Sequence, residues 1–332
     1  WGEGMMKNKV NIALWLIGLV FLAFFPRLFG IYYTNIMVAL AIFSVFAVSL
    51  NMLLGYTGLL SFGHAMFFGF GGYGTALALT HIPGIGLLPA IGVGVLAAVL
   101  LALILSPLVV RVSGTAFAML HLAFGQLMYV LALKLYNITG GEDGIANFPV
   151  PGVFTESLKG SPENFYYLAM VILGISTWLM WFFTKTPFGQ IQVGIRDNAK
   201  RIDYLGYKVP QSKGVVYVLS ALFAGVAGSV YGLFHNLVSV DGSLGIGMSF
   251  APIISVMIGG VGSFFGPIIG VVIFQMVDEL ILRYTESTEL VMGVILIVVV
   301  MFMPKGFVGL FGILRDKISK QGAPKAEKEK VS

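Results

Sequence analysis

The sequence contains no cysteine and very little fixed charge. Only 11% of its 332 residues are Asp, Glu, Lys or Arg, whereas a soluble domain carries about 25%. The stretch from Leu28 to Val110 has none of these four residues. It is several times longer than the about 20 apolar residues that one bilayer crossing needs. Without cysteine, disulfides and thiol metal sites are excluded, and the chain is predicted to cross a membrane many times.

Motifs for catalysis are absent as well. No Gly-Lys dipeptide occurs, so no Walker A loop can form, and neither His-Glu-x-x-His nor Gly-x-Ser-x-Gly is present. The four His residues are scattered along the chain. Acidic residues lie at segment ends or in loops, whereas ion-coupled carriers place them inside the membrane. We therefore expect a transport protein that is not an enzyme, holds no cofactor or metal itself, and takes its energy from a partner.

Glycine is abundant, with 43 residues, and hydrophobic residues make up 58% of the chain. Almost unbroken aliphatic runs such as Val95–Val110 favour helices over the alternating strands of a barrel. In membrane helices, glycines let two backbones approach closely, which we expect for Gly228 with Gly232 and for the series Gly262, Gly266 and Gly270. The predicted fold class is all-α: a polytopic transmembrane helical bundle of about ten membrane segments, including broken or re-entrant helices.

Apolar runs separated by turn residues divide the chain. Residues 1–10 are a predicted cytoplasmic N-terminus, 11–304 a transmembrane domain and 305–332 a cytoplasmic tail. Before the first long loop, the predicted segments are Asn11–Phe25, Tyr32–Leu54, Leu59–Thr80, Leu87–Val110 and Gly114–Tyr136, with a turn at Pro26–Gly30. After it come Phe165–Thr184, Gly214–Leu237, Met248–Ile258, Ile268–Val277 and Leu290–Met303.

The two long polar loops differ in charge. Residues 137–164 carry four acids against Lys159 alone, whereas residues 185–213 carry six basic side chains against two acids. The positive-inside rule places the basic loop and both termini in the cytoplasm and leaves residues 137–164 outside. With that topology, residues 245–277 must enter and leave on one side. A break is therefore predicted at Gly259–Pro267, and in transporters such breaks commonly build the substrate site.

The basic loop, residues 185–213, contains a predicted amphipathic helix that starts near Asp197 and Asn198 and stops near Gly206. Apolar residues among its charges favour docking of a partner protein. The alternative is a loop that only sets topology and binds anionic lipid headgroups. The residues expected to couple the chain to its partner are Arg196, Asp197, Asn198, Lys200, Arg201, Leu205 and Gly206.

Four ordered motifs together resemble the LivM-type permease of branched-chain amino acid ABC importers, over most of residues 35–310. They are Asn51–Tyr73, Thr139-Gly-Gly-x-x-Gly144, TPFGQIQVGIRDN with the following LGY, and GGVGSFFGP. The resemblance implies a multi-pass subunit of a bacterial or archaeal inner membrane that passes Leu, Ile or Val inward. Its implied partners are a LivH-type permease, two cytoplasmic ATPases that bind ATP and Mg, and an extracytoplasmic amino-acid-binding protein. Membrane lipids are further expected contacts, and nucleic acid is not.

The resemblance leaves the cargo open, because the same superfamily includes urea and short-amide permeases. The alternative function is a self-sufficient channel or facilitator for such a small polar solute. The sequence also lacks a clean Glu-Ala-Ala…Gly box, by which many ABC importers meet their ATPase. Around Asn198-Ala-Lys200 only the Ala matches, so the docking role is assigned to the loop more firmly than to any one residue.

The sequence contains two further groups of candidate site residues, one for a substrate pathway and one for its outer mouth. The predicted substrate pathway comprises Tyr56, Thr57, Gly58, Ser61, Phe62, His64, Gly259, Gly260, Gly262 and Ser263. The predicted outer mouth comprises Thr139, Gly140, Gly141 and Gly144, where a turn that meets the binding protein and a plain loop are equal alternatives. For His64 we favour a hydrogen bond across helices over contact with cargo. Phe62, Phe67 and Phe68 are expected to pack or to gate.

The stretches Gly55–Gly63 and Gly259–Gly266 also resemble each other, with glycines and a Ser-Phe pair at similar places. Both are expected near the cytoplasmic side. An internal repeat is one interpretation, and coincidence in a glycine-rich chain is the other.

Overall fold

The computed structural model describes residues 2–150 and 162–282, with single residues at 290–291, 293–294, 297, 301 and 306–307. The predicted last segment, Leu290–Met303, and the tail therefore lie almost wholly outside the described residues. Within the described residues, six helices are long and apolar enough to cross a membrane: Phe24–Thr57, Leu87–Val109, Thr115–Lys134, Glu163–Lys185, Val209–His235 and Val240–Gly259. The prediction of an all-α membrane bundle is confirmed.

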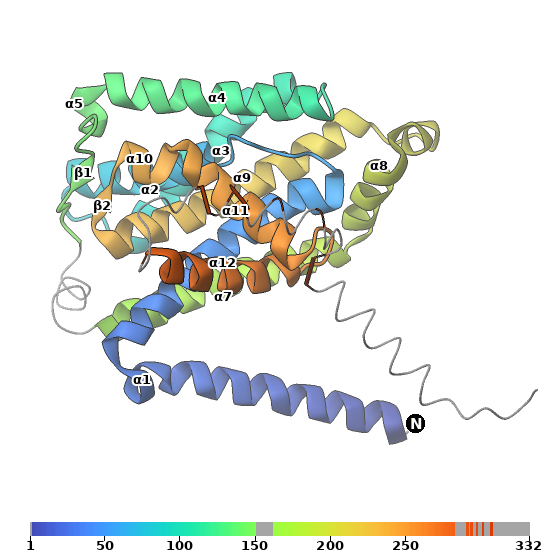
Figure 1. Cartoon of the computed structure of the whole chain (residues 1–332), viewed down its shortest axis with the longest axis horizontal. Helices are drawn as coiled ribbons and strands as arrows, with labels where there is room; N and C mark the ends of the chain where they lie inside the picture. Colours follow the sequence, from blue (N-terminus) through green and yellow to red (C-terminus); the bar gives the residue numbers. More distant parts are fainter. Residues whose placement is uncertain are drawn as a thin grey trace, which may run out of the picture.

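The helices pack side by side, with irregular structure concentrated at two opposite ends of the bundle (Figure 1). In chain order the elements are α1 (Gly2–Thr57), α2 (Ala65–His81), α3 (Leu87–Val109), α4 (Thr115–Lys134), α5 (Tyr136–Thr139), β1 (Ile145–Ala146), α7 (Pro162–Lys185), α8 (Pro187–Tyr204), α9 (Val209–His235), β2 (Leu237–Val238), α10 (Val240–Leu244), α11 (Ile246–Gly259) and α12 (Gly266–Leu282). Helix α8 lies at one end, and β1, β2 and α5 lie at the other (Figure 1). These are called the α8 end and the ladder end.

Helix α1 is bent rather than divided by a turn. The sequence predicts a turn at Pro26–Gly30, but the helix runs through Pro26 and only Gly30 leaves helical geometry, with φ 77° and ψ 179°. Proline removes one helical hydrogen bond without ending the helix everywhere it occurs, whereas glycine adopts a positive φ at little cost. A single residue thus separates the two rods of α1 (Figure 1).

Helix α2 forms the centre of the bundle and packs against α3 and α9. Glycines make this possible, because a Cβ at Gly71 would meet the backbone of Gly225 and a Cβ at Gly228 would meet the backbone of Phe68. The close approach predicted for Gly228 is confirmed. The helix begins at Ala65 and not at Leu59 as predicted, because residues 58–64 form an irregular loop that starts with Gly58 at φ 71°.

Helix α8 is longer than the sequence analysis predicts. It begins at Pro187, where the Thr186 hydroxyl accepts from the Gly189 amide at 3.2 Å. Asn198 interrupts it with φ −158° and ψ 92°, and the Asn198 side-chain oxygen accepts from the Arg201 amide at 3.0 Å. The predicted start near Asn198 therefore holds only for the second piece. The first piece has its own start signal, Thr as N-cap followed by Pro.

The predicted break near the end of the chain is confirmed. Helix α11 ends at Gly259 and α12 begins at Gly266, and the residues between them include Gly260 and Gly262 with φ 116° and 89°. Gly262 lies in the turn and not in a helix, but the close backbone approach predicted for it is present, against Gly55 of α1, and Gly270 packs on the Ser255 carbonyl of α11. Together with α10, α11 is also long enough to cross a membrane, so the first piece is not the short segment that was expected.

Candidate functional site

The last turns of α1 and the break between α11 and α12 lie against each other. The Asn51 side-chain amide of α1 donates to the Ser263 carbonyl at 2.9 Å. A Cβ placed at Gly55 would stand 2.9 Å from the Gly262 amide nitrogen, so only glycine permits this approach. The structure therefore places the end of α1, from which residues 56–64 continue, against Gly262 and Ser263 of the predicted substrate pathway.

One guanidinium from α8 reaches this contact. Arg196 Nη1 donates to the Gly55 carbonyl at 2.6 Å. That carbonyl belongs to the last turn of α1, where carbonyl groups lack helical partners and a cation is favourable. A Cβ at Gly58 would come within 3.1 Å of the Arg196 side chain, and one at Gly262 within 3.2 Å. Gly58 leaves room for the aliphatic part of the Arg196 side chain, and Gly262 for its guanidinium.

We call this set the Arg196 junction, defined as Asn51, Gly55, Gly58, Arg196, Gly262 and Ser263. The Arg196 side chain is 35% exposed and pairs with the Asp197 carboxylate at 3.1 Å. Its contacts join three parts of the chain: α8, the end of α1 and the α11–α12 break. A displacement of α8 would therefore act on both glycine-rich stretches at once.

Buried hydrogen bonds fasten the loop at residues 58–64 on its inner side. The Ser61 hydroxyl is 2.7 Å from His121 Nδ1, and the Tyr217 hydroxyl is 2.8 Å from His121 Nε2. His64 Nε2 is 3.0 Å from the hydroxyl of Ser49 on α1. Ser61 and His64 are fully buried. The hydrogen bond across helices expected for His64 is present, and in this conformation neither side chain faces open space.

The remaining predicted pathway residues occupy mixed positions. The Thr57 hydroxyl donates to the Leu53 carbonyl at 2.5 Å, and the Phe62 ring packs on Phe250 of α11 with ring centroids 5.5 Å apart. Phe67 and Phe68 are fully buried in the core, which fits the packing role among the two expected for them. Whether any pathway residue touches cargo stays a prediction.

The predicted outer mouth is a built turn at the ladder end. The Thr139 hydroxyl donates to the Ala132 carbonyl at 2.5 Å, and Gly140, Gly141 and Gly144 all have positive φ. A Cβ at Gly144 would strike the Val238 carbonyl. The strand that follows, β1, pairs antiparallel with β2, with Ile145 opposite Val238. The segment is a turn, and its contact with a binding protein stays a prediction.

The predicted coupling residues occupy two kinds of position. Arg196 is bonded into the bundle and Asn198 caps the second piece of α8. Lys200, Arg201, Leu205 and Gly206 are exposed, next to Tyr204, which is 89% exposed. Beyond Asn198, α8 therefore presents basic and apolar side chains outward.

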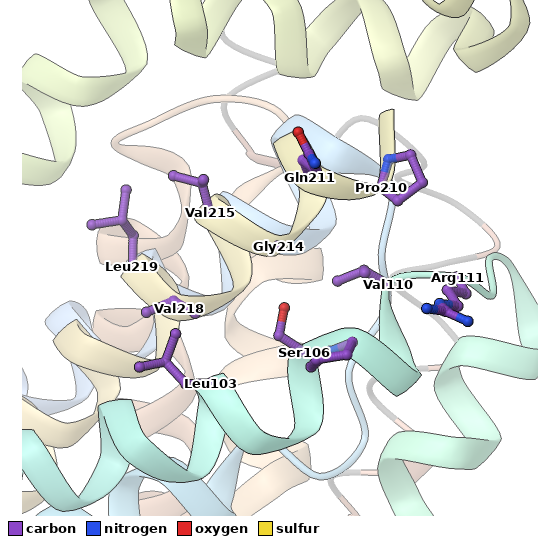
Figure 2. A pocket seen from close by; sticks show the side chains of 11 residues that line it. Leu103, Ser106, Val110, Arg111, Pro210, Gln211, Gly214, Val215, Val218 and Leu219 are labelled. Carbon is purple, nitrogen blue, oxygen red and sulfur yellow. The ribbon is translucent and has the colours of Figure 1, made fainter. Parts of the chain in front are cut away.

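A groove elsewhere contains none of the predicted site residues. It lies between α3 and α9, has a volume of about 590 Å³, and is lined mainly by apolar side chains (Figure 2). In the part of the chain that the structure describes, no three His, Asp or Glu side chains gather as a metal site would require.

Sequence reasoning missed the residues that hold the site together. These are Asn51, which spans the two glycine-rich stretches, and His121 with Tyr217, which hold the loop. A signal was available, because a polar side chain in a charge-free membrane segment needs a partner inside the protein. This signal indicates that such a side chain has a hydrogen-bonding group to pair with, but not which residue provides it.

Residues 32–302 match the family described as branched-chain amino acid transport system, permease component. The chain belongs to this family, and the resemblance drawn from its motifs is confirmed. No solved structure matches it.

Individual relatives include the high-affinity branched-chain amino acid transport permease LivM of Escherichia coli K12, 27% identical over 96% of this chain and 80% of the relative. The probable LivM of Methanocaldococcus jannaschii is 23% identical over 80% of this chain and 83% of the relative. The LivH permease of Salmonella typhimurium is 22% identical over 80% of this chain and 91% of the relative. The chain is thus similar to both permeases of such systems.

Proposed function

We propose that this chain is the membrane-spanning permease subunit of an ABC importer that passes branched-chain amino acids inward. The observation that carries the proposal is the family match over residues 32–302, with similarity to LivM over 96% of the chain. The chain has no Gly-Lys dipeptide for a Walker A loop. In this proposal it is not an enzyme and holds no cofactor, and ATP and Mg are bound by partner subunits.

The proposed complex contains a second permease of the LivH type, two cytoplasmic ATPases and an extracytoplasmic amino-acid-binding protein. Similarity to both LivM and LivH relatives supports a paired permease. The basic residues of 185–213 support an orientation with the α8 end in the cytoplasm. The turn at the ladder end then faces outward, where a binding protein would deliver cargo.

The outer half of α8 is the proposed docking site for an ATPase. Tyr204 at the end of α8 is exposed, as are Leu205 and Tyr207 just after it, outside the candidate membrane spans. Exposed apolar side chains gathered in one place are typical of protein interaction sites. Lys200 and Arg201 on the same piece add positive charge, which gives the site specificity for a partner with acidic groups.

The Arg196 junction is the proposed route by which docking reaches the path. A coupling mechanism requires an element whose position both sites influence. Helix α8 meets this description, because its outer half is free to bind and its inner half is bonded to the end of α1 beside the α11–α12 break. Movement of α8 would shift these two glycine-rich stretches together and so open or close the path at the α8 end.

Uptake by reconstituted complexes tests the function. Proteoliposomes that contain the chain with its LivH-type partner, both ATPases and the binding protein should take up labelled leucine only when ATP reaches the ATPases. Liposomes that contain the chain alone serve as the control and should be inactive. Uptake of leucine or urea by the chain alone without ATP would contradict the importer and support the facilitator.

A further inference from the structure

The groove between α3 and α9 follows from how the two helices pack. Its floor exists because Gly214 has no side chain: a Cβ there would lie 3.0 Å from the Ser106 hydroxyl of α3. Leu103 and Leu219 line one end, and Arg111 lies at the other (Figure 2). The volume of about 590 Å³ falls within the range of about 300–1,000 Å³ that is typical of small-molecule sites.

The position of the groove in the chain fixes its place relative to the membrane. Both α3 and α9 are candidate membrane spans. Arg111 is the first charged residue after the charge-free stretch from Leu28, and Lys208 and Lys213 flank the start of α9. The polar end therefore lies at the interface and the apolar end at the depth of hydrocarbon. Leu103 is 51% exposed and Val215 47%, so the groove opens outward from the bundle.

The chemistry of the lining selects the occupant. Apolar walls favour a hydrocarbon chain, and the described residues that line the groove include Arg111 but no Asp or Glu. The N-terminal turn of α9, with Gln211 in it, also favours negative charge. A free anion would gain nothing from the walls, and an uncharged hydrocarbon would gain nothing from Arg111.

We propose that the α3–α9 groove binds one anionic phospholipid, with an acyl chain along Leu103, Val215 and Leu219 and the phosphate at Arg111. The inference requires only that the chain spans a membrane, and it stands apart from the cargo and the ATPase partners proposed above. Bound there, the lipid bridges α3 and the beginning of α9, the helix that follows α8 in the chain.

Native mass spectrometry of the full chain in mild detergent tests the proposal. Phosphatidylglycerol and zwitterionic phosphatidylcholine are added in separate titrations. The wild type should hold one phosphatidylglycerol about fivefold more tightly than phosphatidylcholine, the factor expected of one basic residue beside an anionic lipid. Arg111→Gln should abolish this preference. Lys134→Gln, which removes a basic residue from the last turn of α4 instead, should keep it.

A second variant tests the apolar part of the groove. Val215→Trp fills the groove from an exposed position and should weaken binding of both lipids, and circular dichroism reports whether the variant is folded. Equal retention of both lipids by the wild type would overturn the proposal, as would an unchanged preference in Arg111→Gln. A cysteine at Val215 that cross-links to the second permease would show that a protein covers the groove, and would overturn it too.

Discussion

Neighbouring basic residues on α8 differ in what their charge acts upon. Both are exposed to solvent, but the Arg196 guanidinium donates to the carbonyl end of α1, whereas Arg201 donates its backbone amide to the Asn198 cap. The sequence predicts the same coupling role for both, because the residue type alone does not show whether an arginine side chain faces a partner or the bundle. Which of them turns inward depends on the glycines at positions 58 and 262, which are far from α8 in sequence.

The first prediction separates these two residues. Arg196→Gln should leave ATPase binding intact but lower uptake by roughly tenfold, which corresponds to about 1.4 kcal/mol, near the lower end for a hydrogen bond to a charged group. Arg201→Gln is the matched control and should weaken co-purification of the ATPase instead. Co-purification and leucine uptake are measured for both variants at equal membrane levels. Identical behaviour of the two variants would contradict separate roles.

At the scale of the helices, apolar length and turn residues predict an element well when both of its ends are set locally. Helix α3 was expected at 87–110 and runs from Leu87 to Val109. Helix α2 was predicted to start at Leu59 and starts six residues later, at Ala65. The difference arises because Ser61 and His64, in the loop before it, hydrogen bond to other helices. The α11–α12 break was predicted from its glycines, but its contact with Asn51 and Gly55 at the end of α1 was not.

A second prediction concerns the crossing of α2 and α9. Gly228→Ala places a Cβ against the Phe68 backbone, and overpacking of this kind costs about 1–3 kcal/mol. The melting temperature in detergent should therefore fall. Gly174→Ala on α7 is the matched control, because a Cβ there meets nothing within 4 Å. Alanine is the better helix former by up to about 1 kcal/mol, so this control should melt at the same temperature or higher. Equal losses in both variants would argue against the close crossing.

At the scale of the whole molecule, the sequence predicts the bundle and its two polar ends but not how each end is held together. The ladder end is fixed by backbone hydrogen bonds between β1 and β2, continued by the Asn147 amide to the Asn236 carbonyl at 3.0 Å. The α8 end is held by side chains, Asn51 and Arg196, on glycine-rich turns. Hydrophobic periodicity carries no information about such contacts between distant residues.

The third prediction fixes the orientation of these ends. Because the chain has no cysteine, Glu142→Cys at the ladder end and Tyr204→Cys at the α8 end each give a unique thiol on an exposed residue. In intact cells made permeable only at the outer membrane, an impermeant maleimide should label Glu142→Cys and spare Tyr204→Cys until the inner membrane is opened. The reverse labelling would place α8 outside and remove the basis for ATPase docking.

Because the two ends are held by different kinds of bond, we expect them to differ in how far they can move. The backbone hydrogen bonds between β1 and β2 act as a pivot, because they resist sliding of the two strands but permit small tilts of the helices around them. The two side-chain bonds of Asn51 and Arg196 at the opposite end can be broken without unpairing any backbone. We expect a displacement of α8 to tilt the helices about the paired strands. A small movement at the α8 end would then widen the bundle there, while the ladder end hardly moves.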